Sequence, residues 1–260
     1  MKKGIFDTHA HYNDKKFEGE EEKLISFVHE NGVDYICNVG ANIKESMESI
    51  ELAKKFDYVF CSVGIHPFYA SELEENWEEK FLSLLKNDKV VAIGEAGLDY
   101  SQEDFSKKDQ FNLFEKQLDI AKTLDIPFIV HSRDAQDDTL AIIKNFPEVK
   151  GVIHCFSGDD KLAEKYAQMG WYIGFTGVVT FKNAKKTVRA ALAIDEDKMV
   201  VETDCPYMAP EPLRGSVCNS SMIPHIIQKI ADIKNISYEE VLEKTRNNAF
   251  SLYKIKSKEV

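Results

Sequence analysis

The chain has 260 residues, of which 43% are hydrophobic, and its 44 acidic and 33 basic residues give a formal net charge of -11. This balance argues against a broad basic surface for coating nucleic acid, although bound metal ions would supply local positive charge for a polyanionic substrate. Mean hydropathy is -0.34, no apolar stretch reaches membrane-spanning length, and five cysteines without a CxxC pair give little support to a disulfide framework. We therefore expect a cytoplasmic protein with no membrane contact and no obligate protein partner.

Eight short apolar runs with strand-like composition follow one another along the chain, at 4–7, 35–39, 58–64, 89–94, 127–130, 150–153, 171–175 and 199–201. The segments between them have helical spacing of apolar residues, as at Leu24, Phe27 and Val28 before a helix-ending Gly32. Buried strands alternating with amphipathic helices predict a parallel sheet. Eight such units predict one closed (β/α)8 TIM barrel, a single domain over residues 1–260, with its active face at the carboxyl ends of the strands.

Side chains of the metal-binding type stand at the ends of these runs. His9 and His11 are two apart on a strand, so both point the same way and can share one ion. One isolated histidine in such a place is more often satisfied by backbone groups. Because the strand ends of a barrel meet at one mouth, we expect a metal site there, built from His9, His11, Glu95, His131, His154 and Asp204.

Three acids suggest the chemistry of the site. Glu95 lies among glycines after the fourth run, where a carboxylate can bridge two ions. Asp204 is expected to bind an ion and accept a proton from an attacking water. Glu202 is expected to orient a ligand or water from behind, with a purely structural acid as the alternative. Three such ligands per ion, with positions left for water, are typical of a hydrolytic site. Zn, Mn, Co, Ni and Mg all suit it.

Six ordered segments resemble the TatD-type metal-dependent deoxyribonucleases, which belong to the metal-dependent hydrolase barrels. The segments are FDTHAH at 6–11, GIHP at 64–67, GEAGLDY at 94–100, HSRDA at 131–135, HCFSG at 154–158 and ETDCPY at 202–207. The resemblance runs almost end to end. It implies a nuclease (DNase) with a TIM barrel, two or three divalent metal ions, and hydrolysis of phosphodiester bonds in DNA, either single-stranded or bound by an end.

The resemblance also implies roles for the individual side chains. His9, His11 and Asp204 would hold one ion, and Glu95 would bridge it to a second ion. His131 and His154 would hold that second ion, while Glu202 matches an acid associated with a further one. On the substrate side, His66 and Arg133 would donate hydrogen bonds to phosphate oxygens, with loop stabilisation as the alternative for both.

One segment departs from the family pattern. Many relatives carry Arg-Gly-Lys after the last strand, whereas this chain has Arg214, Gly215 and Ser216. The missing lysine leaves open a second hypothesis, in which the same scaffold hydrolyses another ester or an amide. A third hypothesis, a non-catalytic barrel, would predict the loss of at least one of the six metal-binding residues, and none is missing.

Two cysteines next to these residues are expected to face away from the site. Cys155 follows His154 and Cys205 follows Asp204. Strand alternation predicts that both thiols point into the layer between barrel and helices. Cys218, in the loop after the last strand, is expected to be exposed.

Overall fold

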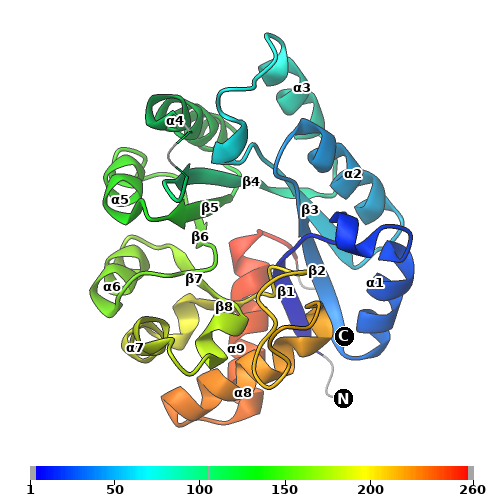
Figure 1. Ribbon diagram of the computed structural model, residues 1–260, viewed down its shortest axis with the longest axis vertical. Helices are drawn as coiled ribbons and strands as arrows, with labels where there is room; N and C mark the ends of the chain where they lie inside the picture. The colour runs from blue at the N-terminus through cyan, green and yellow to red at the C-terminus, as the bar shows by residue number, and fades with distance from the viewer. Residues whose placement is uncertain (1–3, 103, 105, 257–260) are drawn as a thin grey trace.

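Eight parallel strands form one sheet whose order follows the sequence (Figure 1), in a computed structural model that describes residues 4–102, 104 and 106–256. The strands are β1 (Ile5–Ala10), β2 (Val33–Val39), β3 (Val59–Val63), β4 (Val90–Asp99), β5 (Phe128–Arg133), β6 (Gly151–Ile153), β7 (Tyr172–Phe175) and β8 (Met199–Val201). The sheet closes where Ala10 bridges to Cys205, and where the His11 amide donates to the Cys205 carbonyl at 2.9 Å. The prediction of a (β/α)8 TIM barrel is confirmed.

Helices surround the barrel on its outside (Figure 1). They are α1 (Glu21–Glu30), α2 (Ile43–Lys54), α3 (Trp77–Leu84), α4 (Lys107–Leu124), α5 (Gln136–Lys144), α6 (Asp160–Gln168), α7 (Lys185–Ala193) and α8 (Ile223–Lys234). Several begin at residues that cap free amides: Asn42, Ser106 and Asp159 each accept a hydrogen bond from the backbone amide three residues on. After α1, Gly32 has φ of 101°, which agrees with its predicted place at the helix end.

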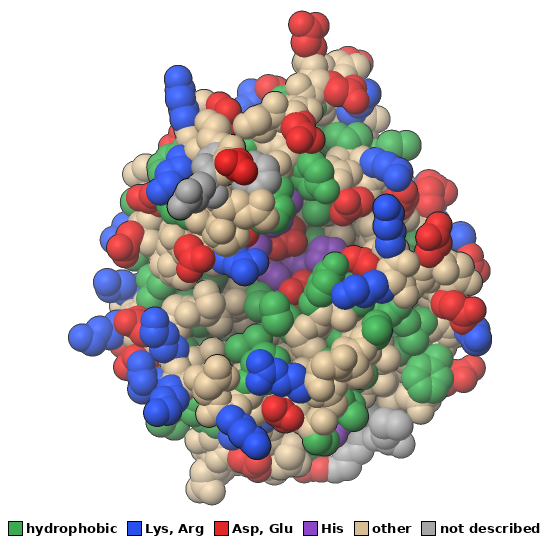
Figure 2. Space-filling view, in the orientation of Figure 1, with side chains coloured by type: hydrophobic (Ala, Val, Ile, Leu, Met, Phe, Trp, Pro, Cys, Tyr) green, Lys and Arg blue, Asp and Glu red, His purple; other side chains and the backbone are tan. Residues whose placement is uncertain are grey.

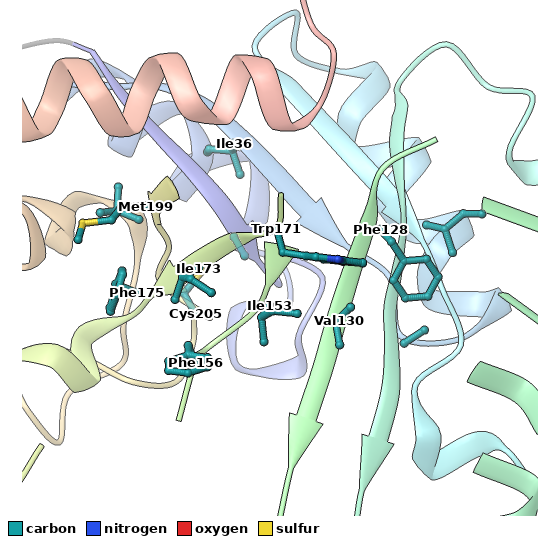
Figure 3. Close-up of a cluster of buried hydrophobic side chains, with 14 of the residues drawn as sticks. Ile36, Phe128, Val130, Ile153, Phe156, Trp171, Ile173, Phe175, Met199 and Cys205 are labelled. Carbon is teal, nitrogen blue, oxygen red and sulfur yellow. The ribbon is translucent and has the colours of Figure 1, made fainter. Parts of the chain in front are cut away.

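Side chains of the strands divide between two hydrophobic layers. One layer lies between the strands and the outer helices, where Phe128, Val130 and Ile153 pack near Trp171 (Figure 3). The other lies inside the barrel and contains Ile129 and Val152. Neighbouring residues of one strand thus enter different layers, as strand alternation requires.

A further helix, α9 (Tyr238–Leu252), packs against β1 and β8 and completes the inner layer. The rings of Phe250 and Tyr253 lie 5.6 and 5.8 Å from that of Phe6, between centroids. The Tyr253 hydroxyl donates to the buried Thr8 carbonyl at 2.5 Å, and the Asn248 amide donates to the Met199 carbonyl at 2.7 Å. Aromatic packing and hydrogen bonds therefore join this helix to the first and last strands.

The fourth strand is longer than its apolar run predicts, so that Glu95 lies within β4 and not after it. The second half of β4 continues to pair with β5, up to Asp99 opposite Arg133. The two backbones approach so closely at Gly97 that a Cβ there would lie 2.0 Å from the His131 carbonyl oxygen. Glycine therefore lets the polar half of β4 remain in the sheet, where an apolar pattern could not reveal it.

None of the helices in the described ranges is both long enough and apolar enough to span a lipid bilayer.

Candidate metal centre

Histidine and acidic side chains meet in a hollow at the centre of one face of the barrel (Figure 2). The six predicted metal-binding residues lie there, brought from β4, β5, β1 with the residue after it, and the segments that follow β6 and β8. Burial ranges from complete for His9 to side chains 16% exposed for Asp204 and 17% exposed for His131. The closure of the barrel thus gathers groups that are far apart in the sequence.

Four of these side chains form one half of the cluster. The Nε2 atoms of His9 and His11 lie 3.0 Å apart. Glu95 Oε2 lies 3.6 and 3.7 Å from these two nitrogens, and Asp204 Oδ1 lies 3.9 and 3.5 Å from them. Two nitrogens and two carboxylate oxygens therefore converge on one small volume, with the spacing that a shared cation would need.

The other oxygen of Glu95 faces the second pair of histidines. Glu95 Oε1 lies 2.6 Å from His131 Nδ1 and 3.8 Å from His154 Nε2. The His154 ring stacks on the His9 ring, with centroids 3.4 Å apart. One carboxylate thus stands between two histidine pairs and gives one oxygen to each.

The outer ring nitrogens of three histidines have acceptors behind them. His11 Nδ1 lies 3.0 Å from the Val39 carbonyl oxygen, and His131 Nε2 lies 2.9 Å from Asp99 Oδ2. His154 Nδ1 lies 3.0 Å from Glu202 Oε1. The contact of His154 with Glu202 is a close ionic one, because no hydrogen bond of His154 Nδ1 occurs within the described residues. When His11 and His131 donate the proton of the outer nitrogen to their acceptors, their inner nitrogens present lone pairs to the centre. Such an arrangement orients histidines that bind metals.

The chemistry of this donor set fits divalent metal ions. The Nδ1 atom of buried His9 has no hydrogen-bond partner among the described residues, and its Nε2 faces another imidazole nitrogen. Two imidazole nitrogens 3.0 Å apart cannot both present lone pairs to each other at low cost without a cation or a proton between them. Nitrogen and carboxylate ligands of this kind suit the metals expected from the sequence.

Burial and mutual charge shift the pKa values of these groups. Burial and the neighbouring His154 lower the pKa of His9 to about 4. Burial alone would lower the pKa of His131 and His154, but Glu95 raises the first to about 9 and Glu202 with Asp204 raises the second to about 10. Burial would raise the pKa of Glu95, yet His131 holds it well below its usual range. Glu95 is therefore ionised at neutral pH, as a ligand must be.

Glu202 is completely buried behind His154. Its Oε1 accepts a hydrogen bond from the Cys155 amide at 2.6 Å, and its Oε2 accepts one from the Thr8 hydroxyl at 3.4 Å. These bonds fix Glu202 between β1 and the segment after β6. The supporting role of Glu202 stays a prediction.

The two residues expected on the substrate side differ in their surroundings. His66 is buried, and its Nδ1 accepts a hydrogen bond from the Phe68 amide at 3.2 Å. The ring lies 4.4 Å from that of His131, and burial lowers its pKa to about 3. A neutral His66 therefore carries its proton on Nε2, where it can donate. Arg133 is exposed at the end of β5, where no ion pair of its guanidinium occurs within the described part of the chain.

Sequence reasoning overlooked Asp99 and misplaced two cysteines. Asp99 lies behind His131. Burial alone would raise the pKa of Asp99, but His131 outweighs this effect and lowers it to about 2.

Cys155 does not face away from the site, because β6 ends at Ile153 and Cys155 has φ of 43°. Its Sγ atom lies close to ligand atoms of His154 and Asp204. Cys218 is buried and not exposed, whereas Cys205 lies in the outer layer as predicted.

Comparison with known proteins places this geometry in a family. The chain matches the family model described as TatD related DNase over residues 6–254. It is 35% identical over 253 residues to the uncharacterized metal-dependent hydrolase YabD of Bacillus subtilis, a match that covers 96% of this chain and 99% of that protein. It is also 28% identical over 258 residues to the 3'-5' ssDNA/RNA exonuclease TatD of Salmonella typhimurium, covering 96% of this chain and 99% of that protein.

The solved structures include similar folds. The TatD homologue YjjV of Escherichia coli K12 matches with a TM-score of 0.91 and 27% identity, over 97% of this chain and 98% of that one. A TatD family hydrolase from Entamoeba histolytica matches with a TM-score of 0.88 and 25% identity, over 97% of this chain and 99% of that one. The chain therefore belongs to the TatD-related DNase family of metal-dependent hydrolases.

Proposed function

We propose that this protein is a metal-dependent exonuclease that hydrolyses phosphodiester bonds of single-stranded DNA. The observation that carries the proposal is the position of Glu95, whose two oxygens face two different histidine pairs. A carboxylate so placed is suited to bridge two ions. The name of the Salmonella relative, an exonuclease for single-stranded DNA and RNA, supports the choice of substrate.

The chain's own residues then have distinct tasks. Bound ions would lower the pKa of a water molecule and neutralise charge that develops on the phosphate. His9, His11 and Asp204 would hold one ion, His131 and His154 the other, and Glu95 would contact both. Asp204 is the most exposed of the acids that face the centre, so its second oxygen can accept the proton that the attacking water loses.

Two further acids would position the ligands. Asp99 accepts from His131, and Glu202 stands behind His154, so each acid fixes the direction of one ring. We regard both as positioning residues, because neither faces the open side of the hollow: Asp99 is 1% exposed and Glu202 is 0% exposed.

His66 and Arg133 would receive the substrate. His66 Nε2 is a neutral donor beside the histidine cluster, and the exposed Arg133 guanidinium can form paired hydrogen bonds with phosphate oxygens. A neutral donor and a cation at the mouth would bind a phosphodiester without competing for the ions. The mouth would thereby carry a local positive charge although the net charge of the chain is negative.

The deciding experiment follows cleavage of end-labelled single-stranded DNA by protein that has been stripped of metal with a chelator. Mg, Mn, Co or Zn is then returned, and the Asp204→Asn variant is measured in parallel. Asp119→Asn is the matched control, because Asp119 is exposed on α4, away from the cluster. We expect stepwise shortening from one end that requires both metal and Asp204, and a parallel RNA strand tests the preference for DNA.

An opposite result would change the assignment. If the protein binds the ions stoichiometrically but cleaves no DNA or RNA strand with any of them, the nuclease proposal is wrong. The same metal-loaded protein would then be tested on aryl esters and lactones, since the scaffold can serve other hydrolytic reactions.

A further inference from the structure

A cavity of about 380 Å³ opens between the segments that follow β7 and β8. It is lined by residues of the segment that links β7 to α7, by the first turn of α7 and by the loop that follows β8. The lining includes Phe181, Asn183, Lys185, Lys186 and Arg214. These five residues combine an aromatic ring, an amide and three positive charges around one opening. We call this opening the basic cavity.

The segment after β7 and the loop after β8 contact each other and form the wall of the basic cavity. The short helix η3 (Gly177–Thr180) follows β7, and the loop after β8 lies directly on it. A Cβ at Gly177 would lie 1.9 Å from the Met208 carbonyl oxygen, so only glycine allows this contact. The Glu211 amide donates to the Thr180 hydroxyl at 2.8 Å. Arg214 lies three residues after Glu211, so its position depends on this contact with η3.

No acid of the described ranges pairs with the cations of the basic cavity. Lys185, Lys186 and Arg214 are exposed, and within the described residues no ion pair with an acid occurs at any of the three. Lys185 and Lys186 also open α7, where positive charge opposes the helix dipole and does not help the helix. Lys and Arg side chains gather over α6 and α7 in Figure 2. In a chain with net charge -11, this group of cations gives the basic cavity a local positive charge.

The aromatic ring of the basic cavity is already paired with a cation. The Arg214 guanidinium carbon lies 4.2 Å from the centre of the half-buried Phe181 ring. One face of the guanidinium is held by the ring, and exposure of Arg214 leaves the other face to solvent. A flat cation held in this way is a surface on which a nucleic-acid base can stack.

The basic cavity lies within reach of a strand whose end occupies the metal centre. The Thr176 hydroxyl lies 3.6 Å from Cys155 Sγ, and Cys155 belongs to the cluster with His154 and Asp204. Five residues lead from Thr176 to Phe181, and an extended chain of that length spans at most about 18 Å. On the other wall, the segment from Asp204 to Arg214 exposes the apolar side chains of Tyr207, Met208 and Leu213.

We propose that the basic cavity is a second subsite, which binds a phosphate and a base of the single strand away from the bond being cut. Lys185 and Lys186 contact the phosphate, and Arg214 on Phe181 carries the base. The inference rests on the proposed nuclease function. It explains how an acidic protein holds a long strand: the metal centre takes the reacting end, and the basic cavity takes a later nucleotide.

The test measures binding and cleavage separately. Binding uses metal-loaded protein and a fluorescent phosphorothioate strand of about 12 nucleotides, which resists hydrolysis, followed by anisotropy at several salt concentrations. For Lys185→Gln with Lys186→Gln we expect roughly ten-fold weaker binding, and a slope of log affinity against log salt reduced by about 1.4, since each lost single-strand contact removes about 0.7. Arg214→Gln should weaken binding with a smaller change of slope, because Arg214 carries the base, so that stacking is lost and not a phosphate contact.

The matched control replaces Lys86 and Lys144 with glutamine. Both are exposed and lie before β4 and β6, at the opposite end of the barrel from the metal centre. Cleavage kinetics supply the second measurement: KM for the normal strand should rise in the cavity variants while kcat stays within about twofold, since only uniform binding is lost. Hydrolysis of a small chromogenic phosphodiester, which cannot reach the basic cavity, should not change.

The results separate this inference from the proposed function. Equal binding of the phosphorothioate strand by wild type and cavity variants would overturn the subsite, as would an equal loss in the lysine control. A wild-type protein that binds no strand would overturn it too. If binding depends on the basic cavity but no strand is cut with any metal, the subsite stands and the nuclease proposal fails.

Discussion

Replacing Asp99 with asparagine isolates the support that one acid gives to the metal centre. Asp99 Oδ2 lies 2.9 Å from His131 Nε2, while Oδ1 accepts from the Ser101 amide at 2.8 Å. Asparagine has nearly the same shape and can keep the bond to Ser101. Its amide nitrogen then faces His131 Nε2, where two donors would oppose each other. The ring must move its proton to Nδ1, the nitrogen that faces Glu95.

The size of the effect follows from the bond that is lost. A hydrogen bond to a charged group contributes about 1.5–3 kcal/mol, and 1.4 kcal/mol is a factor of ten in affinity. Loss of a carboxylate behind a metal-binding histidine typically weakens metal binding by about 10 to 100-fold. The energy of the lost hydrogen bond and the typical effect of losing such a carboxylate therefore predict a similar loss of metal affinity. We therefore expect the second ion, the one near His131, to bind about 10 to 100-fold more weakly in Asp99→Asn.

Isothermal titration with Zn and Mn measures this without depending on activity. Asp138→Asn is the matched control, because Asp138 accepts from the Tyr100 hydroxyl at 2.8 Å in the same region and has no contact with His131. The reasoning is refuted if Asp99→Asn binds two ions with wild-type affinity. It is equally refuted if Asp138→Asn loses as much affinity as Asp99→Asn.

Three further perturbations address stability. Removing the ions should lower the melting temperature by about 5–10 °C, because a ligand at 100 times its Kd stabilises by about 2.7 kcal/mol and each kcal/mol shifts a chain of this size by about 2–4 °C; calorimetry with and without chelator that shows no shift would contradict a metal site. Gly177→Ala should cost about 1–3 kcal/mol in the free energy of unfolding measured in urea, since its Cβ would meet the Met208 carbonyl. Tyr253→Phe should cost about 1–3 kcal/mol by the same measurement, because the buried Thr8 carbonyl loses its donor, and a cost near zero would show that water replaces the hydroxyl.

The sequence predicted the barrel because its strands are buried on both sides and stand out as apolar runs. The six side chains predicted to bind metal could be picked out because they end such runs, and barrel geometry brings strand ends together. Asp99 escaped notice because it lies in the polar half of β4, where pairing with β5 and the contact at Gly97 keep the strand extended without an apolar pattern.

Other features depend on contacts between distant parts of the chain. The turn at Cys155 places its thiol beside the site although strand alternation predicts the opposite face. Helix α9 has an amphipathic pattern like that of the outer helices, and its contacts with β1 and β8, such as that between Phe250 and Phe6, show that it belongs to the inner layer. The basic cavity likewise joins Arg214 to Phe181, two residues that no local pattern connects.

The hydrogen bond between Tyr253 and Thr8 joins residues separated by 245 positions, which has a consequence for synthesis on the ribosome. At about 5–20 residues per second, the first strand emerges roughly 12–50 s before the helix that covers its inner face. During that time Phe6 and its neighbours in the inner layer have no α9 against which to pack. Until α9 has been made, the hydrophobic inner face of the first strand therefore lacks the helix that covers it in the folded protein.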